Sequence, residues 1–463
     1  QSYIGKSNYD DPLYQGDFKD FRVYKNALTE AQINQIVGKE AGTSQYSMAI
    51  DGNQVTKKLS DSLYGLFYED INSAADGGLY PEMVKNYSFE NAYVQKGGDN
   101  TYFQQNGYET RGNYKLHWEA SPAGNFAINS ENAQGTDDKL NEKNPHYAIL
   151  TGNVTLKNGG FAPQNSPNSA AMPVKPVNTE KGAGIYTFSV FAKAAQGYGG
   201  KLKVKLVNDN GASLTNEQEV ALGADGSWKK VSVDLTSNVS SNTKGKLMLT
   251  VEGAGTGEKL SLDMVSVVPH DSYGNKNYAY GVGIRQDLID LMMDLNPKFM
   301  RFPGGCIVEG FNWEGLYDWR DSVGPLEERR SNTNRWENWN NQNRTWGYMQ
   351  SYGFGYHELL SLCEDFGMEP FPIMSAGVLC QYETNGVNAK TGNDLQYFID
   401  MATNLLDYCW GDASSNAWAA KRAENGHAEP FNLKYLGIGN ENAKEKYFDN
   451  FDSIKAAVES YAA

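Results

Sequence analysis

The chain has 463 residues, a formal net charge of −15 and a pI near 4.9, and its basic residues form no stripe. An acidic chain of this kind does not favour nucleic acid or an anionic membrane surface as a partner. It has no apolar run of about 18 residues, so no membrane-spanning helix is predicted, and its length predicts about three domains.

The N-terminal segment has the pattern of a strand followed by a helix. Residues 16–37 pass from an alternating run into a helical turn for which Thr29 is the predicted N-cap. This stretch resembles the closing segment of laminin-G-like sandwich domains. We therefore interpret residues 1–40 as the C-terminal remnant of such a domain, with a purely structural tail as the alternative.

Residues 44–90 are expected to hold the first strands of a second domain. A short strand is predicted at Gln45–Ile50. The apolar run Leu63–Ile71 predicts another strand, and Glu69 places a carboxylate at its C-terminal end.

From about residue 91 to 268 the sequence indicates a β-sandwich. Short alternating runs are separated by turn signals such as Asn208–Gly211, which favours a sandwich of the jelly-roll type. Predicted strands cover Ala148–Leu156, Gly184–Ala195, Lys201–Val207, Trp228–Leu235, Lys246–Val251 and Lys259–Val268. Three aromatic residues, Trp118, Tyr147 and Phe161, are candidates for a sugar-stacking face, with core packing as the alternative.

In residues 269–463 predicted helices alternate with predicted strands. The helices are Arg285–Leu295, Tyr356–Gly367 and Leu395–Trp410, and the strands are Lys298–Phe302, Pro370–Ser375 and Lys434–Gly439. This order, with Gly-rich loops after the strands, is typical of a (β/α)8 barrel in which Leu63–Ile71 is strand 1. The predicted fold class is therefore α/β plus all-β: a partial (β/α)8 barrel, strands 1–4, interrupted by the inserted β-sandwich jelly roll.

Polar side chains follow three of these strands. Glu69 follows the first, Arg301 and Cys306 surround the end of the second, and Asn440 and Glu441 follow the fourth. The carboxyl ends of barrel strands meet at one face, which is where barrel enzymes carry their active sites. Glycosidases need two carboxyls at such a site, one to protonate the leaving oxygen and one to attack the sugar or activate water. Taken alone, an Asn-Glu pair after a strand is more often a helix cap or a turn.

With these residues in place, the chain resembles the family 51 glycoside hydrolases, the α-L-arabinofuranosidases. The resemblance covers residues 60–90 and 270–460, and the sandwich between them resembles a carbohydrate-binding module. The supporting motifs are Gly65–Ile71, Gly77–Tyr80, Asn86–Glu90, Arg301–Gly310, Gly324–Arg329, Trp346–Tyr348 and Gly439–Asn442.

The resemblance implies a role for each candidate residue. Glu441 would be the acid/base, Asn440 would contact the furanose 2-hydroxyl, and Glu69 would bind the sugar in the −1 subsite. Cys306 would line the same pocket. Arg301 would orient neighbouring carboxylates, with a core ion pair as the alternative.

One catalytic group is missing from the matched positions. The family's nucleophile is a Glu at the end of strand 7, and the resemblance places that residue beyond position 463. We therefore expect the chain to be part of a longer enzyme that is inactive as given, with any signal peptide upstream of residue 1. An extracellular or periplasmic location is expected.

The expected function is that of a retaining, exo-acting α-L-arabinofuranosidase. Its partners would be arabinose-containing plant polysaccharides such as arabinoxylan or arabinan, and no cofactor, no metal and no nucleic acid are expected. Two alternatives stay open: a non-catalytic carbohydrate-binding protein, and another glycosidase of the same clan, an endo-glucanase or xylanase. The four cysteines fit no zinc pattern and are expected to be buried free thiols.

Overall fold

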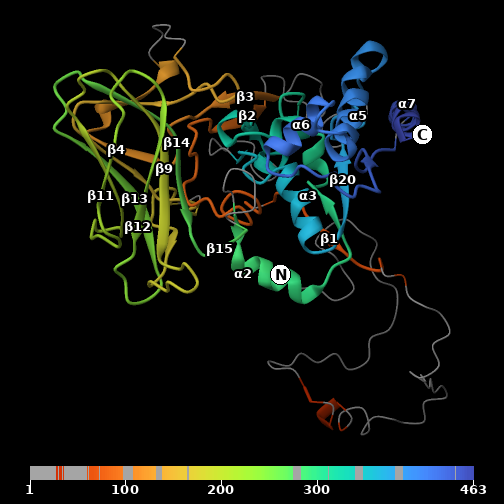
Figure 1. Cartoon of the computed structure of the whole chain (residues 1–463), viewed down its shortest axis with the longest axis horizontal. Coiled ribbons are helices and arrows are strands. Elements are labelled where there is room, and N and C mark those ends of the chain that lie inside the picture. Colours follow the sequence, from red (N-terminus) through yellow and green to blue (C-terminus); the bar gives the residue numbers. More distant parts are fainter. Residues whose placement is uncertain are drawn as a thin grey trace. The chain divides into compact units, whose positions relative to one another are not determined.

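The computed structural model has two compact units, Gln1–Ser60 and Asp61–Ala463 (Figure 1). It describes residues 28–29, 31–33, 35, 60, 62–71, 73–96, 108–131, 138–163, 166–274, 283–310, 312–338, 348–380, 389–443 and 445–462.

In the first unit the predicted helix start is confirmed. Thr29 Oγ1 accepts a hydrogen bond from the Gln32 amide at 3.3 Å, and Gln32 Oε1 accepts one from the Thr29 amide at 2.8 Å. This reciprocal pair satisfies two donors at the start of the helical turn, as a capping box does. The strand predicted at Gln45–Ile50 lies outside the described residues.

Two antiparallel sheets occupy most of residues 118–269, which we call the two-sheet region. One sheet has the order β11-β10-β13-β7-β4, with β8 also paired to β13, and the other has the order β12-β9-β14-β6-β5 (Figure 1). The strands are β4 (Trp118–Ser121), β5 (Phe126–Ile128), β6 (Ala148–Thr151), β7 (Val154–Asn158), β8 (Met172–Val174), β9 (Ile185–Ala194), β10 (Lys201–Val207), β11 (Gln218–Val220), β12 (Lys229–Thr236), β13 (Thr243–Glu252) and β14 (Lys259–Pro269).

The apolar periodicity of these strands explains which side chains they bury. In β9, every second residue from Tyr186 to Ala194 is buried, and β10 and β13 show the same alternation. The buried rows of both sheets join one hydrophobic core. The run predicted as one strand at Ala148–Leu156 is instead two strands in different sheets, because the chain turns at Gly152 with φ +63°.

Three smaller antiparallel pairs lie outside these two sheets in the described part of the chain. They are β2 (Ala92–Lys96) with β3 (Tyr108–Gly112), β15 (Ser272–Tyr273) with β16 (Ile284–Arg285), and β18 (Asn332–Thr333) with β19 (Met349–Gln350). Short 3₁₀ helices lie at η1 (Ala123–Asn125), η2 (Asn129–Glu131), η4 (Cys306–Val308), η5 (Trp319–Ser322), η6 (Leu326–Glu328), η7 (Arg335–Asn338) and η8 (Gly392–Leu395).

A four-stranded parallel sheet carries the remaining candidate residues. Its strands follow chain order, β1 (Leu66–Phe67), β17 (Phe299–Phe302), β20 (Glu369–Met374) and β21 (Gly437–Ile438). The helices are α2 (Gln286–Leu295), α3 (Tyr356–Asp365), α5 (Gln396–Trp410), α6 (Ala417–Glu424) and α7 (Glu445–Ala462). The alternation of strands with helices confirms the predicted α/β character, because parallel neighbours need a crossover connection. We call β1, residues 283–462 and their loops the parallel-sheet region.

The two outer strands of this sheet are shorter than predicted. Only Leu66–Phe67 of the run Leu63–Ile71 is a strand, since the chain bends where the Ile71 amide bonds the Glu69 carbonyl at 2.8 Å. The Tyr68 amide still donates a hydrogen bond to the Arg301 carbonyl at 2.9 Å, so the segment after β1 remains next to β17 up to the start of Glu69. Across the described ranges, no helix is long and apolar enough to cross a membrane.

Candidate active site

The structure brings all five predicted site residues together at the carboxyl end of the parallel sheet. Glu69 follows β1, Arg301 lies on β17, and Cys306 begins η4 directly after β17. Asn440 and Glu441 follow β21. Strands in parallel order deliver their C-terminal loops to one edge, which is why residues far apart in sequence meet here.

A chain of contacts links four of these residues. Arg301 donates a hydrogen bond to Asn440 Oδ1 at 2.8 Å. Asn440 Nδ2 lies 3.7 Å from Cys306 Sγ, and that sulfur lies 3.6 Å from Glu441 Oε2. Arg301 also stacks over the Phe67 ring, 4.5 Å from its centroid. Arg301 therefore orients the side-chain amide of Asn440. The core ion pair considered as its alternative is not observed among the described contacts of Arg301.

Glu69 is held by donors from two other loops. Its Oε1 accepts hydrogen bonds from the Ile307 amide at 3.3 Å and from Trp336 Nε1 at 3.1 Å. A Cβ atom at Gly304 would lie 2.6 Å from Glu69 Cγ, so only glycine fits at that position of the Gly304-Gly305 turn. Gly304 is thus explained by the close approach of this loop to the Glu69 side chain.

Cys306 enters the site as a neutral thiol. A hydrogen bond with Cys380, followed by burial, raises the pKa of Cys306 above its ordinary value. The protonated sulfur can donate a hydrogen bond toward Glu441, and the side-chain amide of Asn440 also contacts this sulfur. All four cysteines are buried and free, which confirms the prediction made from their spacing.

Sequence reasoning missed three residues of this site. Trp336 bonds Glu69, and buried Arg335 lies beside Trp336 with its guanidinium carbon 5.6 Å from the ring centroid. Glu309 is fully buried, and its Oε1 accepts a hydrogen bond from the backbone amide of Asn440 at 3.0 Å. Glu309 lies within the quoted Arg301–Gly310 motif, so a charged residue among apolar neighbours was the available signal.

Glu441 has an unusual backbone conformation. Its φ is +52°, in the left-handed region that costs a non-glycine residue about 1–2 kcal/mol. Strained residues of this kind persist when surrounding contacts fix them, and they cluster at functional sites.

The loop Gly324–Arg329 is anchored by buried polar groups. The Arg329 guanidinium forms two hydrogen bonds with the Glu358 carboxylate, at 2.9 and 2.8 Å, and both side chains are fully buried. Arg329 also bonds the Gly324 carbonyl at 2.9 Å. Arg329 thus fixes the loop Gly324–Arg329 from the interior of the protein.

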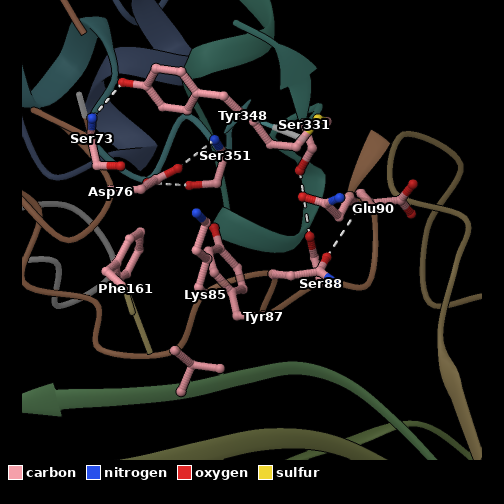
Figure 2. Close-up of a pocket in the computed structure, with 14 residues that line it drawn as sticks. Ser73, Asp76, Lys85, Tyr87, Ser88, Glu90, Phe161, Ser331, Tyr348 and Ser351 are labelled. Atoms are coloured by element: carbon pink, nitrogen blue, oxygen red, sulfur yellow. Dashed lines mark hydrogen bonds between the residues drawn. The ribbon is translucent and has the colours of Figure 1, made fainter. Parts of the chain in front are cut away.

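A small cavity is lined by Asp76, Phe161 and Ser351, among other residues (Figure 2). Its volume is about 30 Å³. The carboxylate of Asp76 accepts hydrogen bonds from the Ser351 amide at 2.9 Å and from Ser351 Oγ at 2.6 Å (Figure 2). Burial, followed by the nearby charge of Asp70, raises the pKa of Asp76 to about 7. A cavity of this size holds a water molecule rather than a sugar.

The proposed sugar-stacking aromatics separate into two groups. Trp118 is 6 % exposed and stacks on Phe89 at 5.1 Å, and Tyr147 is 4 % exposed. Both therefore belong to the core, as the alternative held. Phe161 lines the small cavity instead, with Lys85 Nζ 5.9 Å from its ring centroid (Figure 2).

Comparison with known proteins gives a consistent result. Residues 291–462 match the family model described as Alpha-L-arabinofuranosidase 1 domain. The chain is 33% identical to an extracellular exo-α-L-arabinofuranosidase of Streptomyces chartreusis, over 90% of this chain and 45% of that protein. It is 28% identical to α-L-arabinofuranosidase 1 of Arabidopsis thaliana, over 87% of this chain and 53% of that protein.

A solved structure shares the fold. The arabinose-bound structure of a family 51 α-L-arabinofuranosidase matches with a TM-score of 0.63 at 24% identity, covering 85% of this chain and 57% of the other. The chain thus spans about half the length of the curated relatives named above.

Proposed function

We propose, from the relationship of this chain to the family 51 α-L-arabinofuranosidases, that its residues form part of a retaining, exo-acting α-L-arabinofuranosidase. The observation that carries the proposal is the contact chain Arg301–Asn440–Cys306–Glu441 at the carboxyl end of the parallel sheet. The relatives are named arabinofuranosidases, which favours this activity over a sugar-binding protein or another glycosidase of the clan.

In the proposed mechanism Glu441 protonates the leaving oxygen and later activates water. Asn440, oriented by Arg301, bonds the 2-hydroxyl of the furanose, and Glu69 bonds the same sugar from the opposite loop. A neutral Cys306 thiol fills the space between Asn440 and Glu441 without adding charge. Retention requires a second carboxylate about 5–5.5 Å from the first, which attacks the anomeric carbon and forms a covalent glycosyl-enzyme. We place this nucleophile at the end of a seventh barrel strand, outside residues 1–463.

Two features support a larger barrel around the sheet. The strands follow each other in chain order, and apolar side chains are exposed at both edges of the sheet. Phe67 on β1 is 55% exposed, and Tyr435, which precedes β21, is 53% exposed. We propose that β1, β17, β20 and β21 are strands 1–4 of a (β/α)8 barrel. The two-sheet region would be a jelly-roll sandwich inserted between strands 1 and 2. The corresponding domains would be 1–40, 44–90, 91–268 and 269–463.

The substrate and location follow from the same relationship. We propose terminal arabinofuranosyl side chains of plant polysaccharides such as arabinoxylan or arabinan as substrate. An extracellular location is proposed because one relative carries that description. Release of arabinose from these polymers, compared with xylan and cellulose, tests the assignment.

The acid/base role is tested by Glu441→Ala in a protein that carries these residues with the proposed remaining strands. Hydrolysis of arabinosides with poor leaving groups should fall about 10²–10⁴-fold, because general acid catalysis supplies a factor of this size. Activated aryl arabinosides should lose much less in the glycosylation step, since their leaving groups need no proton.

Glu445→Ala is the matched control, because Glu445 is an exposed carboxylate in the first turn of α7. Glu445→Ala should leave the rate of hydrolysis of both kinds of arabinoside unchanged. Equal losses on both substrates for Glu441→Ala would contradict the assignment.

A further inference from the structure

Glu309 is fully buried, yet it contacts the turn that carries the proposed acid/base. We propose that Glu309 is a positioning residue that holds the backbone of Asn440 and Glu441 in the geometry required for catalysis. This inference rests on the proposed function of Glu441.

The contacts of Glu309 all point toward this turn. Its side chain is fully buried directly after η4, and its Oε1 accepts the Asn440 amide at 3.0 Å. The same amide lies 2.9 Å from Asn442 Oδ1, and the Asn442 side chain hydrogen-bonds Glu309 in turn. One buried carboxyl thereby ties together the residues on both sides of Glu441.

The turn needs such a contact because Glu441 is in the left-handed region, with φ +52°. The side chain of Asn440 is already fixed by Arg301 and Cys306. Glu309 fixes its main chain. Because both the side chain and the main chain of Asn440 are held, the backbone position from which the Glu441 side chain extends is fixed.

Glu309 performs this role as a neutral acid. Burial raises the pKa of Glu309 well above its ordinary value, and the nearby Cys380 and Glu441 raise it further, against the hydrogen bonds from Asn440 and Asn442. On the α7 side the facing titratable group is Tyr447. Glu309 Oε2 is buried and has no hydrogen-bond partner among the described residues. A neutral carboxyl can hold the turn without placing a second negative charge beside Glu441.

This reasoning predicts opposite results for two substitutions. Glu309→Gln keeps a neutral side chain with a carbonyl acceptor for the Asn440 amide. It should retain kcat/KM within about 3-fold and leave the pH profile unchanged. Glu309→Ala removes the acceptor and should lower kcat about 10²-fold, the scale expected when a catalytic group is misplaced by about 1 Å. KM should change little, because Glu309 does not contact the sugar.

Asp263 supplies a matched control. It is also a fully buried carboxyl with a raised pKa and a hydrogen bond from a backbone amide, that of Met264 at 2.7 Å, but it lies on β14 in the two-sheet region. Asp263→Ala should lower thermal stability without changing kcat or its dependence on the leaving group. An equal loss of kcat in both alanine variants would show a general effect of destabilisation and overturn the positioning role.

A second measurement uses the 463-residue chain and needs no activity. Amide hydrogen exchange of residues 438–443 should be at least 10-fold faster in Glu309→Ala than in wild type and near wild type in Glu309→Gln. Unchanged exchange in Glu309→Ala, or losses in Glu309→Gln as large as in Glu309→Ala, would overturn the inference. If exchange responds as expected but the longer protein hydrolyses no arabinoside, the proposed function fails while the positioning contact stands.

Discussion

The two-sheet region and the parallel-sheet region place their charges in different ways. On β10 the lysines at 201, 203 and 205 alternate with buried Leu202 and Val204, and their charged ends meet exposed acids across the sheet surface. In the parallel-sheet region, Arg329 and Glu358 are both fully buried. Surface pairs are screened by water, whereas a buried pair cannot lose one member without leaving an uncompensated charge.

This difference teaches where the molecule tolerates polar burial. The two-sheet region follows the rule of apolar inside and polar outside along β9 and β13, and the buried carboxyl of Asp263 on β14 departs from it. The parallel-sheet region buries Asp76, Glu309 and the Arg329–Glu358 pair around the loops that follow its strands. Its interior is therefore specified by hydrogen-bond geometry as well as by apolar area.

The largest expected effect comes from breaking the buried ion pair. Arg329→Met should lower the free energy of unfolding by about 3–5 kcal/mol, because Glu358 would remain buried without its cation. The double variant Arg329→Met/Glu358→Leu should lose much less, since neither charge is left alone. Urea unfolding of the single and double variants measures both values. If the double variant lost as much free energy of unfolding as Arg329→Met and Glu358→Leu together, this account would be contradicted.

A smaller effect is expected from pH. Burial raises the pKa of Asp76 to about 7 from an ordinary value of 3.8. Between about pH 4 and 7 the folded state therefore holds a proton that the unfolded state has released, and the free energy of unfolding falls as pH rises through this window. The three-unit shift corresponds to at most ~4 kcal/mol.

The test is Asp76→Asn, which should flatten this part of the stability profile measured by thermal unfolding at several pH values. Some slope should remain, because burial also raises the pKa of Glu82 to about 7. Asp294→Asn, at an exposed position on α2, is the control. An unchanged profile in Asp76→Asn would show that Asp76 is ionised in the folded protein.

The smallest effect is expected on the surface of the two-sheet region. Lys205 and Glu217 lie 2.8 Å apart with side chains 20% and 40% exposed. A double-mutant cycle with Lys205→Ala and Glu217→Ala should give a coupling of about 0.2–1 kcal/mol that decreases with added salt. A coupling as large as that of Arg329 with Glu358 would remove the contrast between the two regions.

The sequence predicted more of the two-sheet region than of the site loops. Alternating runs such as Lys201–Val207 fix both the strand and its buried face, since the side-chain period of a strand is 2. The same signal failed at Ala148–Leu156, where Gly152 turns the chain between two sheets. It also overestimated β1, because the apolar side chains at 63, 64 and 71 are exposed and only Leu66 and Phe67 have strand partners on β17.

For the site, the sequence by itself determined which residues are candidates for the chemistry. The motifs around Glu69, Arg301, Cys306, Asn440 and Glu441 mark the ends of three strands, and the structure brings these residues together. Only the tertiary structure decided what surrounds them, namely the Trp336 donor to Glu69 and the buried Glu309 acceptor for Asn440. The physical reason is that these contacts join loops separated by more than 100 residues, and their distances and burial depend on how the whole sheet is packed.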